Sequence, residues 1–171
     1  MTLFEIRQRL KELGIAHTDC KIACREFLPK LLHDHQIAIT LTLRGTWYSM
    51  NGKQKVNFYL RDANIEAIWG RFVHKLNKLI WKNAYRSKRH RLNTIAVLED
   101  AHETQRKHLH GALGHFPQDF NFKTLPGLVR KASQECYEID FQHREDISDS
   151  GWFEYITKHI DRDNTDNVIW G

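Results

Sequence analysis

The stretch from Lys107 to His115, Lys-His-Leu-His-Gly-Ala-Leu-Gly-His, constrains the fold more than any other part of the chain. It reads as a short β-strand, in which successive side chains point to opposite faces. His108 and His110 would then share one face, and Leu109 and Leu113 would point to the other face, toward a core. The small residues beside the histidines leave room for another molecule to approach. The stretch therefore predicts a two-faced strand with a metal-centred site on one side.

The segment before this strand supplies a carboxylate. Residues 94–100 read as a second strand, and a polar turn after it predicts an antiparallel hairpin. If Leu98 packs inward with the leucines of the next strand, Glu99 joins His108 and His110 on the other face. One carboxylate and two imidazoles suit Mg²⁺ or Mn²⁺ acting on a phosphate, although such a set also accepts Zn²⁺ or Co²⁺. With eleven histidines in the chain, a chance His-x-His is the alternative for the pair alone.

Hydrophobic periodicity elsewhere alternates between strand and helix patterns. Period-two alternation from Gln36 to Arg44 predicts a half-buried strand, and the turn signal Asn51-Gly52 predicts a strand or hairpin over residues 46–59. The predicted helices span residues 2–13, 18–32, 62–85, 126–133 and 150–160. A further strand is predicted over residues 136–141, with Tyr137, Ile139 and Phe141 on one face.

Antiparallel strands interrupted by crossover helices predict an α+β fold. We expect an antiparallel sheet with helices packed on one face and the other face open, in a ferredoxin-like or RRM-like arrangement. At 171 residues the chain fits one such domain with a small appendage. We assign residues 1–35 to an N-terminal helical extension and residues 36–171 to the main domain.

Apolar runs in the chain fall short of the about 18 residues that a membrane-spanning helix needs. The N-terminal segment is charged and amphipathic rather than a secretory signal, so we expect an intracellular protein with no membrane partner. The three cysteines, Cys20, Cys24 and Cys136, have no framework spacing, which predicts reduced thiols.

Positive charge is concentrated between residues 78 and 91 of a chain whose net charge is +5. Trp81 and Tyr85 lie among these cations, and aromatic rings among cations suit stacking on unpaired bases. Taken alone, the basic run has an alternative interpretation as an ordinary solvent-exposed face of a helix, with no nucleic-acid partner. The candidate nucleic-acid contacts in this segment are Lys82, Arg86, Lys88, Arg89 and Arg91.

The last predicted helix presents a tyrosine. Trp152, Phe153, Ile156 and Ile160 form its apolar stripe. Tyr155 lies off that stripe, and Lys158 follows three positions later on a neighbouring patch. A tyrosine used as core filler should lie within the stripe, so Tyr155 reads as a presented side chain, with an ordinary surface tyrosine as the alternative.

In combination these motifs resemble the HUH endonuclease superfamily, and within it the single-tyrosine replication initiators of rolling-circle replicons. The resemblance rests on three motifs in order: a Thr-containing hydrophobic strand (37–43), Glu99 nine residues ahead of His-Leu-His-Gly, and a later Tyr-x-x-Lys on a helix. It covers about residues 36–160, which is most of the chain. The joint pattern is far more specific than any of its parts.

The resemblance implies metal-dependent, sequence-specific nicking and joining of single-stranded DNA to initiate rolling-circle replication of a plasmid or virus. Tyr155 would attack a phosphodiester, leaving a free 3′-hydroxyl and a 5′-phosphotyrosyl enzyme. Glu99, His108 and His110 would hold Mg²⁺ or Mn²⁺, and Lys158 would counter charge on the phosphate or position the tyrosine.

The DNA would be an origin strand, expected in a stem-loop and held by the open sheet face and the basic segment. Candidates for direct contact on the sheet are Thr40, Thr42 and Arg44. No G-x-x-x-x-G-K-[ST] motif occurs in the chain, so unwinding would need a host or replicon helicase acting in trans. The expected location is the cytoplasm of a bacterial or archaeal host, or the nucleus for a eukaryotic virus.

Four other functions share parts of this pattern. A single-tyrosine transposase of the same superfamily uses similar residues, and the Tyr-x-x-Lys pair favours the replication type. A conjugative relaxase would carry a third clustered histidine and an N-terminal tyrosine, and a histidine-triad hydrolase would need a histidine where Ala112 stands. A non-catalytic single-strand binding module is the alternative from another class, and it would need no metal and form no covalent adduct.

Overall fold

The computed structural model describes residues 37–51, 54–61, 64–87, 90–99, 106–146 and 168–170, together with Trp152 and Tyr155. The strands are β1 (Ile37–Leu43), β2 (Thr46–Asn51), β3 (Gln54–Tyr59), β4 (Asn93–Glu99), β5 (His108–Gly114), β6 (Ile139–Asp146) and β7 (Val168–Trp170). The helices are α3 (Ile65–Trp81), α4 (Asn83–Ser87) and α5 (Leu125–Gln134), with a 3-10 turn, η2 (Phe122–Thr124).

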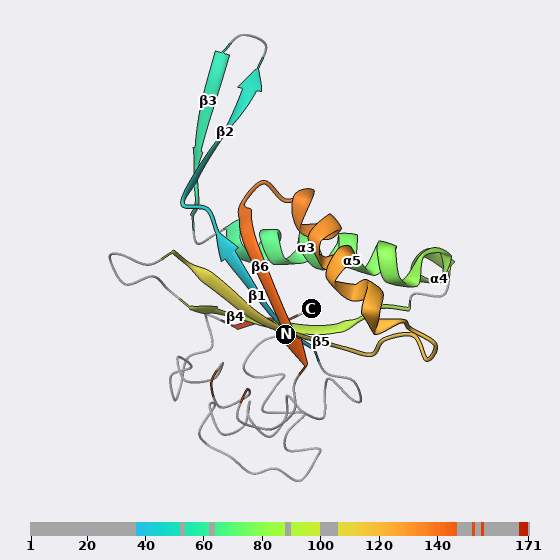
Figure 1. Ribbon diagram of the computed structural model, residues 1–171. Coiled ribbons are helices and arrows are strands. Elements are labelled where there is room, and N and C mark those ends of the chain that lie inside the picture. Colours follow the sequence, from blue (N-terminus) through green and yellow to red (C-terminus); the bar gives the residue numbers. More distant parts are fainter. Residues whose placement is uncertain are drawn as a thin grey trace.

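Five of these strands form one antiparallel sheet in the order β6-β1-β5-β4-β7. Helices α3 and α5 cover one face of this sheet, and the β2-β3 hairpin projects away from it (Figure 1). The predicted α+β class and the packing of helices on one face are confirmed. None of the helices in the described ranges has the length and apolar character needed to cross a membrane.

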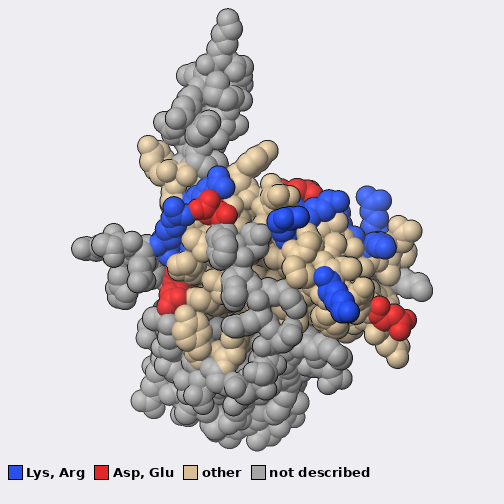
Figure 2. All heavy atoms as spheres, in the orientation of Figure 1, with Lys and Arg blue, Asp and Glu red and all other residues tan. Residues whose placement is uncertain are grey.

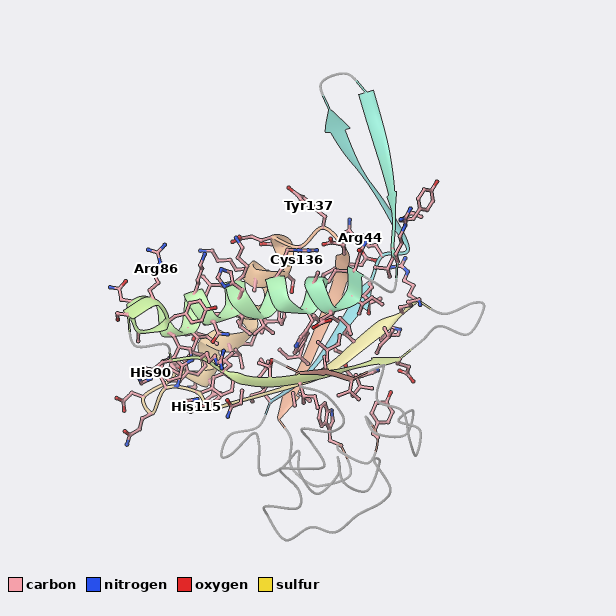
Figure 3. All side chains as sticks on the ribbon, turned by 180° about the vertical axis from the view of Figure 1, so that it is seen from behind. Arg44, Arg86, His90, His115, Cys136 and Tyr137 are labelled. Atoms are coloured by element: carbon pink, nitrogen blue, oxygen red, sulfur yellow. The ribbon has the colours of Figure 1, made fainter. Side chains whose placement is uncertain are left out.

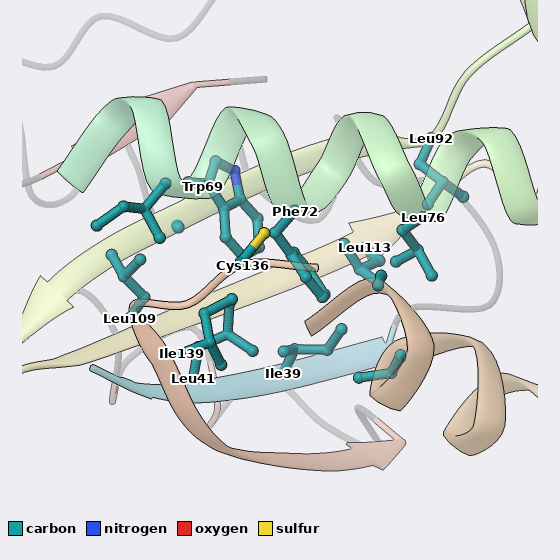
Figure 4. Close-up of a cluster of buried hydrophobic side chains, with 14 of the residues drawn as sticks. Ile39, Leu41, Trp69, Phe72, Leu76, Leu92, Leu109, Leu113, Cys136 and Ile139 are labelled. Atoms are coloured by element: carbon teal, nitrogen blue, oxygen red, sulfur yellow. The ribbon is translucent and has the colours of Figure 1, made fainter. Parts of the chain in front are cut away.

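The apolar residues that recur at strand or helix spacing in the sequence form the buried core. Alternate residues of β1 are buried against the helices, because strand side chains point to opposite faces in turn. Helix α3 buries one stripe of apolar side chains at helical spacing, including the aromatic rings that the sequence places in the core. The core residues shown in Figure 4 include Ile39, Leu41, Trp69, Phe72, Leu76, Leu109, Leu113, Cys136 and Ile139.

Trp69 packs directly onto the backbone of the central strand β5. A Cβ atom added at Gly111 would lie 2.3 Å from Cη2 of the Trp69 ring and 3.1 Å from the carbonyl oxygen of Ile95. The first distance is shorter than real Cβ contacts, so the Trp69 ring would have to shift, and the second is tight against the β4 backbone. Only glycine therefore fits at position 111, one residue after His110.

The second face of the sheet is open at one end only. Ala38, Ile95 and Ala112 lie on this face and are at most 3% exposed. The threonines of β1 and the histidines of β5 share the same face and are partly exposed. The prediction of an open face is therefore wrong at these buried positions, and it holds where β1 ends and β5 begins.

Two predicted elements have different ends in the structure. Tyr137, placed on a strand face with Ile139 by the alternation of apolar residues, lies in a turn and is 75% exposed. The N–H of Ile139 donates to the carbonyl of Cys136, so the chain turns here before β6 begins. The predicted helix over residues 62–85 is divided into α3 and α4 at Lys82, whose φ of 47° breaks the helical path.

Strand β7 was not predicted, because three residues are too few to show a period. The predicted helices over residues 2–13 and 18–32 lie outside the described residues, as does most of the helix over 150–160. The proposed extension over residues 1–35 lies outside them as well. Cys136 is buried and unpaired, and burial raises the pKa of its thiol, which agrees with a reduced core cysteine.

We expect Gly111→Ala to destabilise the protein by about 2–3 kcal/mol, because the new methyl group must displace the Trp69 ring or the β4 backbone. Chemical denaturation measures the difference. Gly70→Ala in α3 is the matched control, since no heavy atom lies within 4 Å of its added Cβ. That substitution should stabilise by about 1 kcal/mol through helix propensity. Equal stability of Gly111→Ala and the unaltered protein would contradict the close contact.

Candidate metal and nucleophile site

Strand pairing brings the predicted ligands to one end of the sheet. Strands β4 and β5 form the predicted antiparallel hairpin, with Glu99 directly opposite His108 and Val97 opposite His110. On the other side of β5, Thr42 lies opposite His108 and Thr40 opposite His110. Directly opposed residues of antiparallel strands share a face, so these side chains all emerge on the second face.

Glu99 and His110 are in direct contact. Oε2 of Glu99 lies 2.7 Å from Nε2 of His110, which is hydrogen-bond distance. The Glu99 side chain is 24% exposed and that of His110 is 12% exposed, so the pair is half-buried but reachable from solvent. The ring centroids of His108 and His110 are 6.1 Å apart. The inference from strand parity that these three side chains share a face is thus matched by the register.

A threonine hydroxyl lies next to each histidine. Oγ1 of Thr40 is 3.1 Å from Nδ1 of His110, and Oγ1 of Thr42 is 3.2 Å from Nδ1 of His108. Direct DNA contact by both threonines stays a prediction. The hydrogen bonds to the histidines were missed, because no local pattern reveals which residues of β1 lie opposite β5.

Tyr155 lies against this cluster although it is far away in the sequence. Its ring centroid is 5.2 Å from that of His110, and the two planes meet at 89°, an edge-to-face contact. Tyr155 has helical backbone conformation and is 43% exposed. Trp152, three residues earlier, is partly buried. The interpretation of Tyr155 as a presented side chain beside the histidines agrees with this position, whereas Lys158 lies outside the described residues.

The donor types around Glu99 fit a divalent ion, but they do not form a ready-made cage. Within the described ranges, no three His, Cys, Asp or Glu side chains converge closely enough to hold a metal. Ligand atoms about 2.1 Å from one ion lie about 3 Å apart at right angles. Oε2 of Glu99 and Nε2 of His110 are 2.7 Å apart, and His108 is a third donor on the same face that does not converge with them.

Two arginines lie at the same end of the sheet as His108. Arg44 follows β1, and its Nε is 3.1 Å from Oδ1 of Asp140, while Arg106 precedes β5 and pairs with Oδ2 of the same carboxylate. One aspartate shared by two guanidinium groups leaves a net positive charge beside the candidate site. Arg44 is one of the predicted DNA contacts. Arg106 is not among them, although its place two residues ahead of His108 was an available signal.

The basic segment lies at the far end of β4 from Glu99. Arg91 precedes β4 and Glu99 ends it, and eight residues of extended chain span about 26 Å. Figure 3 shows Arg86 and Arg44 at opposite ends of α3, and Figure 2 shows Lys and Arg side chains in blue over the helices. Lys82 and Arg86 are exposed, while Lys88 and Arg89 lie outside the described residues. The basic segment and Glu99 therefore lie at opposite ends of β4.

Aromatic rings in the basic segment already have ring partners. Trp81 is partly buried and its ring centroid lies 5.0 Å from that of His90 and 5.7 Å from that of His115. The hydroxyl of Tyr85 lies 2.8 Å from Nδ1 of His74. Burial, and then the charges of nearby lysines, lower the pKa of His74, which favours its neutral form. The predicted stacking of bases on Trp81 and Tyr85 stays a prediction.

Comparison with known proteins adds no assignment: the chain matches no protein-family model, no curated protein and no solved structure.

Proposed function

We propose that this protein is a metal-dependent endonuclease of the HUH type that nicks and rejoins single-stranded DNA through Tyr155. The observation that carries the proposal is the edge-to-face contact of Tyr155 with His110, which itself touches Glu99. A nucleophile and two candidate metal ligands from segments far apart in the sequence thus meet at one partly exposed point.

The topology supports the same proposal. Without the β2-β3 hairpin, the elements follow in the order β1-α3-β4-β5-α5-β6, and the strands lie in the order β6-β1-β5-β4. A β-α-β-β-α-β succession of this kind is ferredoxin-like. The candidate ligands lie on the inner strand β5 and on its neighbour β4, on the face away from the helices. A rigid sheet holds a site more precisely than loops do.

The chemistry assigned to the residues is a phosphoryl transfer. The deprotonated Oη of Tyr155 forms a bond to phosphorus while the bond to the 3′ oxygen breaks, and that oxygen leaves and takes up a proton. The product is a 5′-phosphotyrosine, and reversal of the step rejoins the ends. Because the ordinary pKa of tyrosine is about 10, the site must favour the phenolate.

Glu99, His108 and His110 would hold Mg²⁺ or Mn²⁺, which supplies positive charge to the scissile phosphate when bound. The charged side chains of Arg44 and Arg106 would hold flanking phosphates of the same strand, and Lys158 would assist at Tyr155. The substrate we propose is an origin strand presented in a stem-loop, with a helicase acting in trans. Initiation of rolling-circle replication inside a cell is the process this activity would serve.

Tyr155→Phe should abolish a denaturant-resistant protein–DNA adduct, because it removes Oη and keeps the ring contact with His110. The test incubates the protein with a labelled single-stranded origin oligonucleotide and Mn²⁺ and then separates it under denaturing conditions. Tyr137→Phe is the matched control, since Tyr137 is 75% exposed and lies in a turn outside the site, and it should form the adduct normally. An undiminished adduct in Tyr155→Phe would overturn the nucleophile assignment.

His108→Ala and His110→Ala should lose cleavage and retain binding of the oligonucleotide, because they remove the proposed metal ligands and leave the arginines that would hold the phosphates in place. Omission of Mn²⁺ in a parallel lane should give the same result with the unaltered protein. Unchanged cleavage in either variant refutes the metal role. Binding without cleavage in every protein, with or without metal, would instead support a non-catalytic single-strand binding module.

Arg86→Ala should weaken DNA binding and reduce the slope of log K against log salt by about 0.7, the value for one lost phosphate contact on a single strand. Cleavage at saturating DNA should be unaffected, because Arg86 lies at the opposite end of α3 from Arg44 (Figure 3). Arg130→Ala, which removes one exposed cation from α5 outside the basic segment, is the control. Equal slopes for the two variants would leave the basic segment without a special role in binding.

A further inference from the structure

The β2-β3 hairpin stands away from the body of the domain, as Figure 1 shows. Its two strands form a sheet of their own, with Thr46 opposite Tyr59 at the foot and Asn51 opposite Gln54 near the turn. A two-stranded hairpin alone is only marginally stable in water. The hairpin therefore adds little to the stability of the domain, and among the described strands each of its strands pairs only with the other.

The hairpin and its flanks carry charge of one sign. The cations of residues 44–61 are Arg44, Lys53, Lys55 and Arg61, and no aspartate or glutamate occurs before Asp62. Arg44 and Arg61, at the two flanks, are exposed. Asp140 lies against Arg44, but it also pairs with Arg106, so the charge at the foot stays positive. A projecting element of one charge favours a polyanionic partner over a protein surface of mixed charge.

The foot of the hairpin lies close to the candidate site along the chain. Thr42 of β1 lies opposite His108, and β2 begins four residues later at Thr46. Four residues of extended chain span about 13 Å. The N–H of Leu60 donates to the carbonyl of Gly45 at 2.9 Å, so the two ends of the hairpin leave the body together. A nucleic acid held at the site is therefore within reach of the hairpin.

The shape of the hairpin fits double-stranded DNA. The major groove of B-DNA is about 12 Å wide and admits a two-stranded β-ribbon. Each strand has six residues and extends about 20 Å, enough to follow the groove for roughly half a turn. We propose that the β2-β3 hairpin is a duplex-binding arm that lies in the major groove of DNA, with its cations on the phosphates. The stem of an origin stem-loop is the duplex if the proposed function holds, on which that part of the inference rests.

A single strand is the competing nucleic-acid ligand. Tyr59 ends β3 and is 63% exposed, so its ring is open to stacking by an unpaired base. Stacking along a strand needs rings at intervals, however. Residues 49–57, the outer part of the hairpin, contain Lys53 and Lys55 and no aromatic residue. This distribution favours contact with phosphates in a groove over a path of stacked bases.

The test compares two fluorescent DNA probes on the full chain in EDTA, where no metal-dependent cleavage occurs. One probe is a stem-loop with a stem of about 10 base pairs, roughly one turn, and the other is a strand of equal length that cannot pair. The deletion variant replaces residues 46–59 by Asn-Gly. The hydrogen bond between Gly45 and Leu60 is the one that closes a four-residue β-turn, so this linker suits the gap.

The deletion should raise the Kd for the stem-loop by about 10-fold or more, because several phosphate contacts are lost together. The Kd for the single strand should change by less than about 2-fold, since the sheet and its arginines are intact. Adduct formation through Tyr155 on a single-stranded oligonucleotide with Mn²⁺ should also be retained, which shows that the shortened chain is folded.

Lys55→Gln is a milder variant that decides the matter if the deletion variant does not fold. It should reduce the slope of log K against log salt for the stem-loop by about 0.9, the value for one phosphate contact on a duplex. Lys131→Gln is the matched control, because it removes one exposed cation from α5 and should leave that slope unchanged. Equal slopes for the two variants would contradict a phosphate contact by the hairpin.

The other outcomes also decide. A deletion variant that binds the stem-loop as tightly as the unaltered protein overturns the inference, and an equal loss on both probes overturns it in favour of a general strand-binding element. Unchanged Kd values with a change in sedimentation would assign the hairpin to contact between copies of the chain, which overturns it as well. Stem-loop binding that depends on the hairpin in a protein that forms no adduct supports the arm and refutes the nickase.

Discussion

The contact between the Trp69 ring and the bare backbone at Gly111 determines how the helix layer meets the sheet. Gly111 is paired with Ile39 on one side and Ala96 on the other, so the ring rests over the middle of three neighbouring strands. If β5 slid by one residue, a Cβ atom would enter the space of the ring. The contact therefore holds β5 in register, and the adjacent His110 keeps its place on the opposite face. A packing constraint in the core thus sets the geometry of the candidate site.

Local periodicity was sufficient to predict the elements that surround this contact. Alternation identified β1, β4 and β5, and counting positions along a hairpin placed Glu99 on the face of the histidines. The same reasoning failed at Tyr137, because apolar alternation cannot distinguish the last residues of a turn from the first residues of a strand. It also failed for most of the second face, where Ala38 and Ala112 are buried. Alanine occurs on both buried and exposed faces of sheets, so its presence in a strand does not predict whether that face is covered.

The contacts that depend on long-range register could not be predicted from the sequence. Thr40 and His110 are separated by 70 residues, and Thr42 and His108 by 66, so nothing local indicates that they pair. The sharing of Asp140 by Arg44 and Arg106 likewise depends on the neighbouring positions of β6, β1 and β5. The topology also divides the positive charge into two groups, which the sequence does not reveal. Arg44 and Arg106 lie near the candidate site, and the basic segment with Arg86 lies at the far end of α3.

The long sequence separation between β1 and β5 has a kinetic consequence. Pairing of these strands closes a loop of more than sixty residues, and contacts of this length form late and slowly compared with local hairpins and helices. The β4-β5 hairpin alone can align Glu99 with His108, but the threonine partners arrive only with β1. During synthesis β1 emerges first and must wait for β5. A chain that ends before β5 would therefore lack the contacts that Thr40 and Thr42 make with the two histidines.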